Sequence, residues 1–410
     1  MSTWLIPREE LTPEQVRAFE LDPAQHRVIF GPPGSGKTQI LLHRARYLID
    51  RWKVAPDRFH IFVYTNTLKD YIQSALGLLQ LPPESVSTVD SWYVGFYRTH
   101  IKSRLPRDEN NRLDFKVIRK EANNRIQTTA PGASMYDFVL VDEGQDLEPE
   151  AFDMFWRISK HVTVCTDHKQ QIYDQGSTES AILTGLRLKK KNISFLEAFR
   201  CCPYIVSLAA EFIENTEERE SYIRQAKTTQ TERETPLLYC VSDFEKEKRR
   251  LIEIVRVRLG KGEKIAILLP QNRQVFGFAI GLREAGLEVE TPDNMDFSKD
   301  DPKLMSYHSA KGLTFDSVLM PRLTSNAFPR LTPEKVDRLL FVGITRASKW
   351  VYMSTTQTIQ ASLRERVQKL ESNGLLTVQN DALPLFNDPD LLNAEDGPSD
   401  TEGNDPLDIL

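Results

Sequence analysis

The sequence predicts an α/β protein built from two parallel β-sheets, each with helices packed on both faces. Two observations lead to this prediction. Short apolar runs typical of buried strands alternate with amphipathic helical patterns over most of the chain, and such alternation is typical of parallel sheets. A polar stretch at 226–236 then interrupts the alternation. Polar breaks of this kind join domains, so we expect two α/β lobes with a linker between them.

The predicted elements follow one another in chain order. Strand-like runs occur at His26–Phe30, His60–Tyr64, Asp137–Val141, Val162–Thr166, Lys264–Leu269, Leu304–His308 and Trp350–Ser354. Helical patterns occur at Thr38–Ile49, Pro203–Glu214, Phe244–Leu259 and Val275–Ala285. The first predicted lobe spans 1–225 and the second spans 237–372.

Two further segments differ in composition from the lobes. A short insertion at about 98–130 carries nine Lys or Arg against four Asp or Glu between Arg98 and Arg125. Its position favours contact with phosphates, although its charge fits a solvated helical hairpin equally well. Residues 373–410 are predicted to form a disordered acidic tail, because they are rich in Asp, Asn, Pro and Gly.

Composition bounds the class of protein. Apolar residues make up 40% and charged residues 27% of the 410 residues, as in soluble globular proteins. No segment approaches the roughly 20 apolar residues of a membrane span, and the start of the chain lacks the apolar core of a signal peptide. We therefore expect a cytoplasmic protein with no membrane partner. The net charge is −5, but Gln379–Leu410 contributes −9, so the rest carries +4. Such mild basicity permits a nucleic-acid partner without indicating one.

A glycine-rich loop is the first motif with a specific chemistry. Between a strand-like run and a helical pattern the chain reads Gly31-Pro32-Pro33-Gly34-Ser35-Gly36-Lys37-Thr38. This fits GxxxxGK[ST], in which glycines let backbone N–H groups surround phosphate oxygens at a helix N-terminus. We predict that ATP binds here, with Lys37 on the β- and γ-phosphates, Thr38 on Mg²⁺ and Gln39 lining the site. An incidental glycine-rich turn is the alternative.

A pair of carboxylates follows a buried strand. Asp137–Val141 is followed directly by Asp142 and Glu143. Side chains at the carboxyl ends of parallel strands point into the crevice where such sheets bind ligands. We therefore predict that Asp142 holds Mg²⁺ and that Glu143 polarises the attacking water. A solvated acidic turn is the alternative.

These motifs belong to a longer series. The segment DEGQD at 142–146 resembles the Walker B motif of UvrD/Rep-type superfamily 1 helicases. Other segments resemble the remaining motifs of that family in the same order, from the Q motif to motif VI: Leu11–Gln15, Tyr64–Asn66, Thr88–Trp92, Asp167–Tyr173, Leu196–Arg200, Ile265–Leu268, His308–Phe315 and Phe341–Ala347. The resemblance covers roughly residues 11–354 and implies two RecA-like P-loop NTPase lobes with ATP between them.

The resemblance implies roles for further residues. Arg200 and Arg346 would neutralise charge on the transferring phosphoryl group from opposite sides, and Gln170 would sense the γ-phosphate. The other implied nucleotide contacts are Gln15 at the adenine edge, Tyr173 and Gly312. Single-stranded DNA would cross both lobes, with Tyr64 offering a stacking face. The other implied DNA contacts are Thr65, Asn66, Thr88, Trp92 and His308.

Some positions depart from the family. Thr314 stands where motif V usually has Glu, and the stacking aromatic expected near Gln175 is missing. About 50 residues separate Trp92 from Asp142 and about 35 separate Gln271 from His308, which leaves little chain for the large insertions of full-size relatives. The resemblance therefore implies a minimal form with small or absent inserted subdomains.

The predicted function is that of an ATP-dependent DNA helicase or translocase. The text of motifs III and IV resembles the 3′-to-5′ branch of the family. Three alternatives stay open: a translocase that unwinds poorly alone, a nucleotide-gated ATPase partner of a nuclease in repair or phage defence, and an unrelated P-loop NTPase such as a kinase. Arg200 and Arg346 argue against the kinase. The sequence does not separate DNA from RNA as the partner.

The acidic tail contains a candidate docking segment. Ala382–Phe386 resembles the short peptides with which bacterial proteins bind the sliding clamp, without the leading Gln. Apolar residues in an acidic, disordered segment are typical of docking sites. A sliding clamp or a nuclease is therefore a candidate partner, and a spacer without a partner is the alternative.

Overall fold

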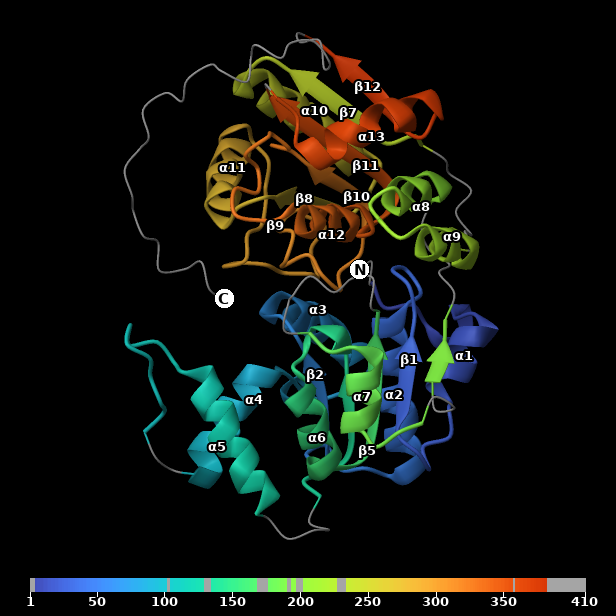
Figure 1. The fold of residues 1–410 in the computed structure, drawn as a ribbon, viewed down its shortest axis with the longest axis vertical. Coiled ribbons are helices and arrows are strands. Elements are labelled where there is room, and N and C mark those ends of the chain that lie inside the picture. Colours follow the sequence, from blue (N-terminus) through green and yellow to red (C-terminus); the bar gives the residue numbers. More distant parts are fainter. Residues whose placement is uncertain are drawn as a thin grey trace.

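The computed structural model describes residues 4–101, 104–128, 134–167, 176–189, 193–196, 202–226, 234–356 and 358–381. In these residues two separate sheets form, and every strand pair within them is parallel. Helices cover both faces of the sheets (Figure 1). The predicted α/β class with two lobes is confirmed. Across the same residues, no helix has the length and hydropathy needed to cross a bilayer.

The first sheet has the strand order β3-β2-β4-β5-β1-β6. Its strands are β1 (Arg27–Phe30), β2 (Phe59–Val63), β3 (Val86–Thr88), β4 (Tyr136–Val141), β5 (Ser159–Thr166) and β6 (Ile193–Phe195). The helices of this half are α1 (Pro13–Phe19), α2 (Lys37–Trp52), α3 (Asn66–Leu76), α4 (Val89–Phe96), α5 (Phe115–Gln127), α6 (Pro149–Ile158) and α7 (Glu179–Gly185).

The second sheet has the strand order β12-β7-β11-β10-β8-β9. Its strands are β7 (Leu237–Val241), β8 (Ile265–Leu269), β9 (Lys303–Ser306), β10 (Phe315–Met320), β11 (Ala347–Thr356) and β12 (Thr377–Asn380). The helices around it are α8 (Pro203–Ala210), α9 (Thr216–Gln225), α10 (Phe244–Gly260), α11 (Asn272–Glu284), α12 (Pro333–Ile344) and α13 (Ala361–Ser372).

Local sequence explains where the helices near the inter-lobe cleft begin. Thr12 and Gln15 form a reciprocal capping box at the start of α1. The side chain of Thr65 caps α3 by accepting a hydrogen bond from the Leu68 N–H, and Thr88 caps α4 in the same way. The central strands are buried on both faces, so they appear as continuous apolar runs such as Phe138–Val141.

The short insertion is a helical hairpin packed on the first lobe. Its helix α5 lies against α4 and α6, and the Tyr93 hydroxyl donates to Asn123 Oδ1 at 2.9 Å. Arg119, one of its basic residues, is paired with Asp90 and Glu148 at 2.9 and 2.7 Å. Part of the basic charge counted in the sequence is therefore neutralised within the fold.

Two helices of the first predicted lobe, α8 and α9, belong to the second lobe instead: α8 packs against β11 and α12, and α9 packs against α8 (Figure 1). The Arg366 guanidinium of α13 donates to the Glu211 carbonyl at 2.8 Å, and the Tyr222 ring meets the Phe341 ring edge-on at 5.4 Å. The predicted boundary at 225 thus separates these helices from the lobe on which they pack. By packing, the lobes divide before Cys202.

The start of the predicted tail also belongs to the second lobe. Strand β12 pairs with β7 at the edge of the sheet, and the Tyr239 hydroxyl donates to Asp381 Oδ2 at 2.6 Å. The prediction of disorder from residue 373 is therefore wrong for 373–381. Residues 382–410, with the candidate docking segment, lie outside the described residues.

Strand β12 gives the first testable prediction. A chain ending at Asp381 should unfold at the same temperature as the full-length protein, whereas one ending at Asn373 should melt several degrees lower and aggregate. Removing β12 uncovers the backbone N–H and C=O groups of β7, and unpaired strand edges promote association. Differential scanning calorimetry with light scattering checks this. Equal stability of the two truncated chains would show that β12 contributes nothing.

Candidate functional site

The glycine-rich loop joins β1 to α2 and has the shape of a phosphate site. Gly34 and Gly36 have φ values of 77° and 80°, a region that favours glycine. Lys37 is only 7% exposed, and its Nζ donates to the carbonyl oxygens of Gly31 at 2.8 Å and Pro32 at 3.3 Å. The loop therefore encloses a buried cation at a helix N-terminus, an arrangement that binds anions.

Gln15 braces this loop against α1. Its Nε2 donates to the Ser35 carbonyl at 3.1 Å, and its Oε1 accepts from the Thr12 N–H at 3.0 Å. A Cβ at Gly36 would lie 2.6 Å from Gln15 Nε2, so only glycine leaves room for the amide. The adenine contact implied by the resemblance stays a prediction. The hydrogen bonds themselves give Gln15 a positioning role.

The two predicted Mg²⁺ ligands meet at the end of β4. The Thr38 hydroxyl, in the first turn of α2, donates to Asp142 Oδ2 at 2.7 Å. Asp142 is fully buried, and this burial, reinforced by neighbouring Glu143, raises the pKa of Asp142 to about 6. A hydroxyl and a carboxylate are oxygen ligands of the kind that Mg²⁺ prefers. The donor set and the crowded negative charge both fit a divalent cation here.

Glu143 points into the cleft from a strained turn. Its φ of 52° lies in the left-handed region, which costs a non-glycine residue on the order of 1 kcal/mol or more and clusters at functional sites. Burial acts to raise the pKa of Glu143, but the charges of Lys37, Lys311 and Arg346 outweigh it and the pKa is lowered. The carboxylate is therefore held in its anionic form, as a residue that polarises water must be.

Gln145, which the sequence analysis did not single out, fixes this turn. It is fully buried, and its Nε2 donates to a Glu143 carboxylate oxygen. Its Oε1 accepts from the Thr166 hydroxyl at 3.0 Å and the Asp167 N–H at 2.9 Å. The Gln in DEGQD thus ties the end of β4 to the end of β5. Its position within this motif was the feature of the sequence that could have marked Gln145 as a functional residue.

A buried ion pair joins the two lobes. Lys311, in the segment between β9 and β10, places its Nζ 2.7 Å from the carboxylate of Asp146 in the first lobe. Both side chains are at most 2% exposed. Burial raises the pKa of Asp146 to about 7, although Lys311 acts to lower it. The partners lie 165 residues apart, so no local pattern in the sequence marks this pair.

Residues of both lobes line one cleft of about 450 Å³. The first lobe contributes the glycine-rich loop and Glu143, and the second contributes Gly312, Thr314 and Arg346. A Cβ at Gly312 would lie 2.9 Å from the Leu68 side chain, so the lobes approach closely there. Arg346 is 4% exposed, and its guanidinium is oriented by the Val342 and Leu313 carbonyls. The structure thus brings the predicted residues of both lobes to one site.

Gln39, which was predicted to line the nucleotide site, has its side-chain amide bound to the N-terminal segment. Its Nε2 donates to the Trp4 carbonyl at 2.6 Å, and its Oε1 accepts from the Ile6 N–H at 2.9 Å. Gln39 therefore lines the cleft and also holds the N-terminal segment against α2. Trp4, which was not predicted from the sequence, lines the cleft as well. Three predicted residues, Gln170, Tyr173 and Arg200, lie outside the described residues.

The predicted DNA contacts lie at strand ends of both lobes. Tyr64, Thr65 and Asn66 follow β2 and begin α3, Thr88 ends β3, and His308 follows β9. Tyr64 and His308 are partly exposed and Asn66 is exposed. Burial, together with Lys311, lowers the pKa of His308, so a neutral imidazole is expected at pH 7. Tyr64 stays a candidate for stacking on a base, and Thr65, Asn66 and His308 stay candidates for contact with a nucleic-acid backbone. Thr88 is 7% exposed and its side chain caps α4, so it is not free for such a contact.

The predicted DNA contact of Trp92 is wrong. Its indole is 8% exposed and stacks on Phe96 with ring centroids 5.2 Å apart. Its Nε1 donates to the Tyr136 hydroxyl at 3.0 Å. The ring is part of the core between the insertion and the sheet, so it offers no face to a base.

Two family models match the chain in the order of the lobes. The UvrD/REP helicase N-terminal domain matches residues 11–130, and the UvrD-like helicase C-terminal domain matches residues 298–358. Both matches support a UvrD/Rep-type superfamily 1 helicase. The resemblance drawn from the motifs is thereby confirmed.

Curated relatives are distant. The mitochondrial ATP-dependent DNA helicase HMI1 of Saccharomyces cerevisiae is 22% identical over 495 residues, which cover 93% of this chain and 70% of the relative. A probable DNA helicase of Mycoplasma pneumoniae is 21% identical over 271 residues, which cover 60% of this chain and 49% of the relative. A solved C-terminal domain of a possible DNA helicase from Lactobacillus plantarum aligns with 44% of this chain and 98% of its own, at 18% identity and a TM-score of 0.35.

The buried Asp146 gives a prediction of pH dependence. Its pKa is about 7 in the folded protein and near 3.9 in an unfolded chain. The folded state therefore holds a proton that the unfolded state releases, and stability falls as pH rises from about 4 to 7. In Asp146→Asn this decline should be shallower. Urea unfolding at pH 5, 6 and 7 measures it, with the exposed Asp57→Asn as control. Equal slopes in all three proteins would contradict the assignment.

Proposed function

We propose that the protein is an ATP-dependent DNA helicase that moves 3′-to-5′ on single-stranded DNA. The observation that carries the proposal is the cleft shared by the two lobes. A nucleotide bound there touches Lys37 in one lobe and Arg346 in the other, so hydrolysis and release change how the lobes meet. The candidate DNA contacts also lie on both lobes, so each cycle of closing and opening moves one set relative to the other.

The charges in the cleft suit phosphoryl transfer to water. Lys37 holds the β- and γ-phosphates, Glu143 orients a water molecule and accepts its proton, and Arg346 neutralises charge on the transferring group. Thr38 and Asp142 would hold Mg²⁺, which supplies further neutralisation of the phosphates when bound. The anionic state of Glu143 and its fixed orientation on Gln145 both serve this step.

The choice of DNA and of direction rests on resemblance. The yeast relative is named as a DNA helicase, and the sequences of motifs III and IV resemble the 3′-to-5′ branch. Candidate phosphate contacts Thr65 and Asn66 stand at the N-terminus of α3, where the helix dipole favours anions.

A second candidate function is an ATPase subunit of a nuclease-partnered complex with little unwinding of its own. It is favoured by the short connection between α11 and β9, residues 285–302. This stretch leaves little chain to engage a duplex ahead of the moving lobes. A strand-separation assay with the isolated protein distinguishes the two functions. Clamp or nuclease docking by residues 382–410 has no support in the described part of the chain.

Two variants test the hydrolytic site. Wild-type protein should hydrolyse ATP faster with single-stranded DNA than without it. Lys37→Ala and Glu143→Gln should each lose about 10²-fold or more of this turnover. Glu143→Gln should still bind ATP, because Lys37, Thr38 and Asp142 remain. Steady-state hydrolysis with single-stranded DNA, RNA and duplex, beside equilibrium ATP binding, measures both effects. Wild-type turnover by Glu143→Gln would sink the assignment of its role.

A third variant tests the contribution of the second lobe. Arg346→Ala should lower DNA-stimulated turnover by about 10³-fold while ATP affinity changes far less, because an arginine of this kind acts on transition-state charge. Arg346→Lys should recover little, since lysine lacks the planar fork of donors. Single-turnover hydrolysis with bound DNA makes the comparison. A large loss of affinity with unchanged turnover would contradict the proposed role.

A further inference from the structure

Arg44, on α2, is a cation buried completely inside the first lobe. Its Nη1 donates to the carbonyl oxygens of Phe19 and Leu21, both at 2.9 Å, and its Nε donates to the Thr163 hydroxyl at 2.7 Å. A buried charge is costly unless other groups compensate it. Within the described residues no carboxylate forms a salt bridge with Arg44, so neutral acceptors hold the guanidinium.

The fourth partner of Arg44 is also neutral. Arg44 Nη2 lies 3.1 Å from His161 Nε2. A guanidinium has no acceptor, so Arg44 donates this hydrogen bond and the imidazole nitrogen accepts it. Burial holds the pKa of His161 well below its usual value, which keeps the ring neutral. Burial also lowers the pKa of Arg44 to about 10, so Arg44 stays charged at pH 7.

The two carbonyl partners lie at the end of α1. Phe19 is the last residue of this helix, and Leu21 follows it by two residues. The last carbonyls of a helix lack a partner within it and carry the negative end of its dipole, so a guanidinium suits them. Near the start of the same helix, Gln15 donates to the Ser35 carbonyl of the glycine-rich loop. Helix α1 is thus held between Arg44 and that loop.

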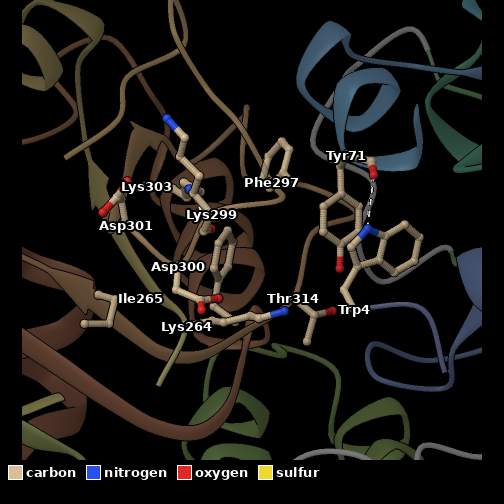
Figure 2. A pocket seen from close by; sticks show the side chains of 11 residues that line it. Trp4, Tyr71, Lys264, Ile265, Phe297, Lys299, Asp300, Asp301, Lys303 and Thr314 are labelled. Carbon is tan, nitrogen blue, oxygen red and sulfur yellow. Dashed lines mark hydrogen bonds between the residues drawn. The ribbon is translucent and has the colours of Figure 1, made fainter. Parts of the chain in front are cut away.

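The N-terminal segment that precedes α1 has its own attachments. Gln39 of α2 donates to the Trp4 carbonyl at 2.6 Å, and the Trp4 indole Nε1 donates to the Tyr71 carbonyl at 3.1 Å (Figure 2). Helix α2 therefore binds the chain before α1 with Gln39 and the chain after it with Arg44. Gln15 lies between these two attachments.

We propose that Arg44 is a positioning residue for nucleotide binding, which fixes the end of α1 so that Gln15 holds the glycine-rich loop in its phosphate-binding shape. The inference rests on the proposed ATP site and adds to it a residue that does not touch the nucleotide. Arg44 follows Lys37 by seven residues, about two turns of helix. Helix α1 has seven residues, too few to be stable alone, so it depends on its attachments.

The effect of Arg44 falls on affinity for ATP rather than on the hydrolytic step. Glu143 and Arg346 stand on other elements, and neither contacts α1 through any hydrogen bond of the described structure. Loosening α1 frees the Ser35 carbonyl from Gln15 and lets the loop relax before a nucleotide binds. Binding then has to order the loop again, which lowers affinity.

Equilibrium ATP binding and single-turnover hydrolysis by the full-length protein test the proposal. Arg44→Lys keeps the charge but lacks the fork of donors that reaches four partners. Its dissociation constant for ATP should rise about tenfold, as for the loss of one buried hydrogen bond. Its single-turnover rate at saturating ATP should stay within about threefold of wild type. Arg46→Lys is the matched control, because Arg46 lies on the same helix and pairs with Asp50 at the surface. Both of its values should be unchanged.

A double-mutant cycle with Gln15→Ala tests the route through α1. When Gln15→Ala is already present, adding Arg44→Lys should weaken ATP binding by less than about twofold, because the contact that Arg44 supports is gone. Hydrogen exchange supplies a second readout. The amides of α1 should exchange faster in Arg44→Lys, whereas those of β10 and β11 should not change. Such a pattern distinguishes local loosening from a general loss of stability.

A second variant serves if Arg44→Lys does not fold. Thr163→Val removes one acceptor of Arg44 at nearly the same size. It should weaken ATP binding by about twofold to threefold, and this loss should vanish when Gln15→Ala is present.

Three results would overturn the inference. Unchanged ATP affinity in Arg44→Lys, or in Thr163→Val where that is the variant that folds, would make Arg44 a core residue alone. Losses that add fully to those of Gln15→Ala would refute the route through α1. Both results leave the proposed function intact if Lys37→Ala still loses hydrolysis. Absence of ATP binding by the wild-type protein would overturn the proposed function as well.

Discussion

Burial of charge between the lobes is the constraint on which the rest of the structure depends. Among the described residues, seven ionisable side chains at the cleft are at most 7% exposed: Lys37, Asp142, Glu143, Asp146, Asp167, Lys311 and Arg346. Removing an ion from water costs several kcal/mol even inside a relaxed protein. Such groups are tolerated when opposite charges meet, as Lys311 and Asp146 do at 2.7 Å. Two of these three cations come from the second lobe, so within this described set the first lobe holds one cation, Lys37, and all four carboxylates.

This balance also bears on the Mg²⁺ that we propose to accompany the nucleotide. The four carboxylates already outnumber the three cations, and crowding shows in the raised pKa of Asp142, which burial causes and Glu143 reinforces. A triphosphate adds further negative charge, so it is accepted only with compensation. Mg²⁺ held by Thr38 and Asp142, as we propose, would provide that charge beside two of these carboxylates, Asp142 and Glu143. Lys311, which follows the candidate DNA contact His308, links the same balance to the nucleic-acid face.

The sequence predicted those elements whose signals lie within a few neighbouring residues. The buried run Phe138–Val141 and the glycine-rich loop carry strand and turn signals within a few residues, and both were confirmed as elements of the fold. Helix α8 was predicted as a helix, but its lobe is set by packing on α12 and β11, which lie more than 100 residues further along the chain. Strand β12 has one apolar residue among four and lies exposed at a sheet edge, so no hydrophobic pattern marks it. Trp92 was predicted to contact DNA because of its motif, although the apolar rings next to it in the sequence already indicated a buried position.

The site itself is held largely by neutral amides. Gln15, Gln39 and Gln145 each use a donor and an acceptor of one side chain: on the glycine-rich loop, on the N-terminal segment, and on Glu143. A carboxylate of the same shape could only accept hydrogen bonds, and it would add negative charge where carboxylates are already in excess. An amide fixes its partners without disturbing that balance. Glutamine is therefore the side chain that positions this cleft while leaving its charge available for the nucleotide.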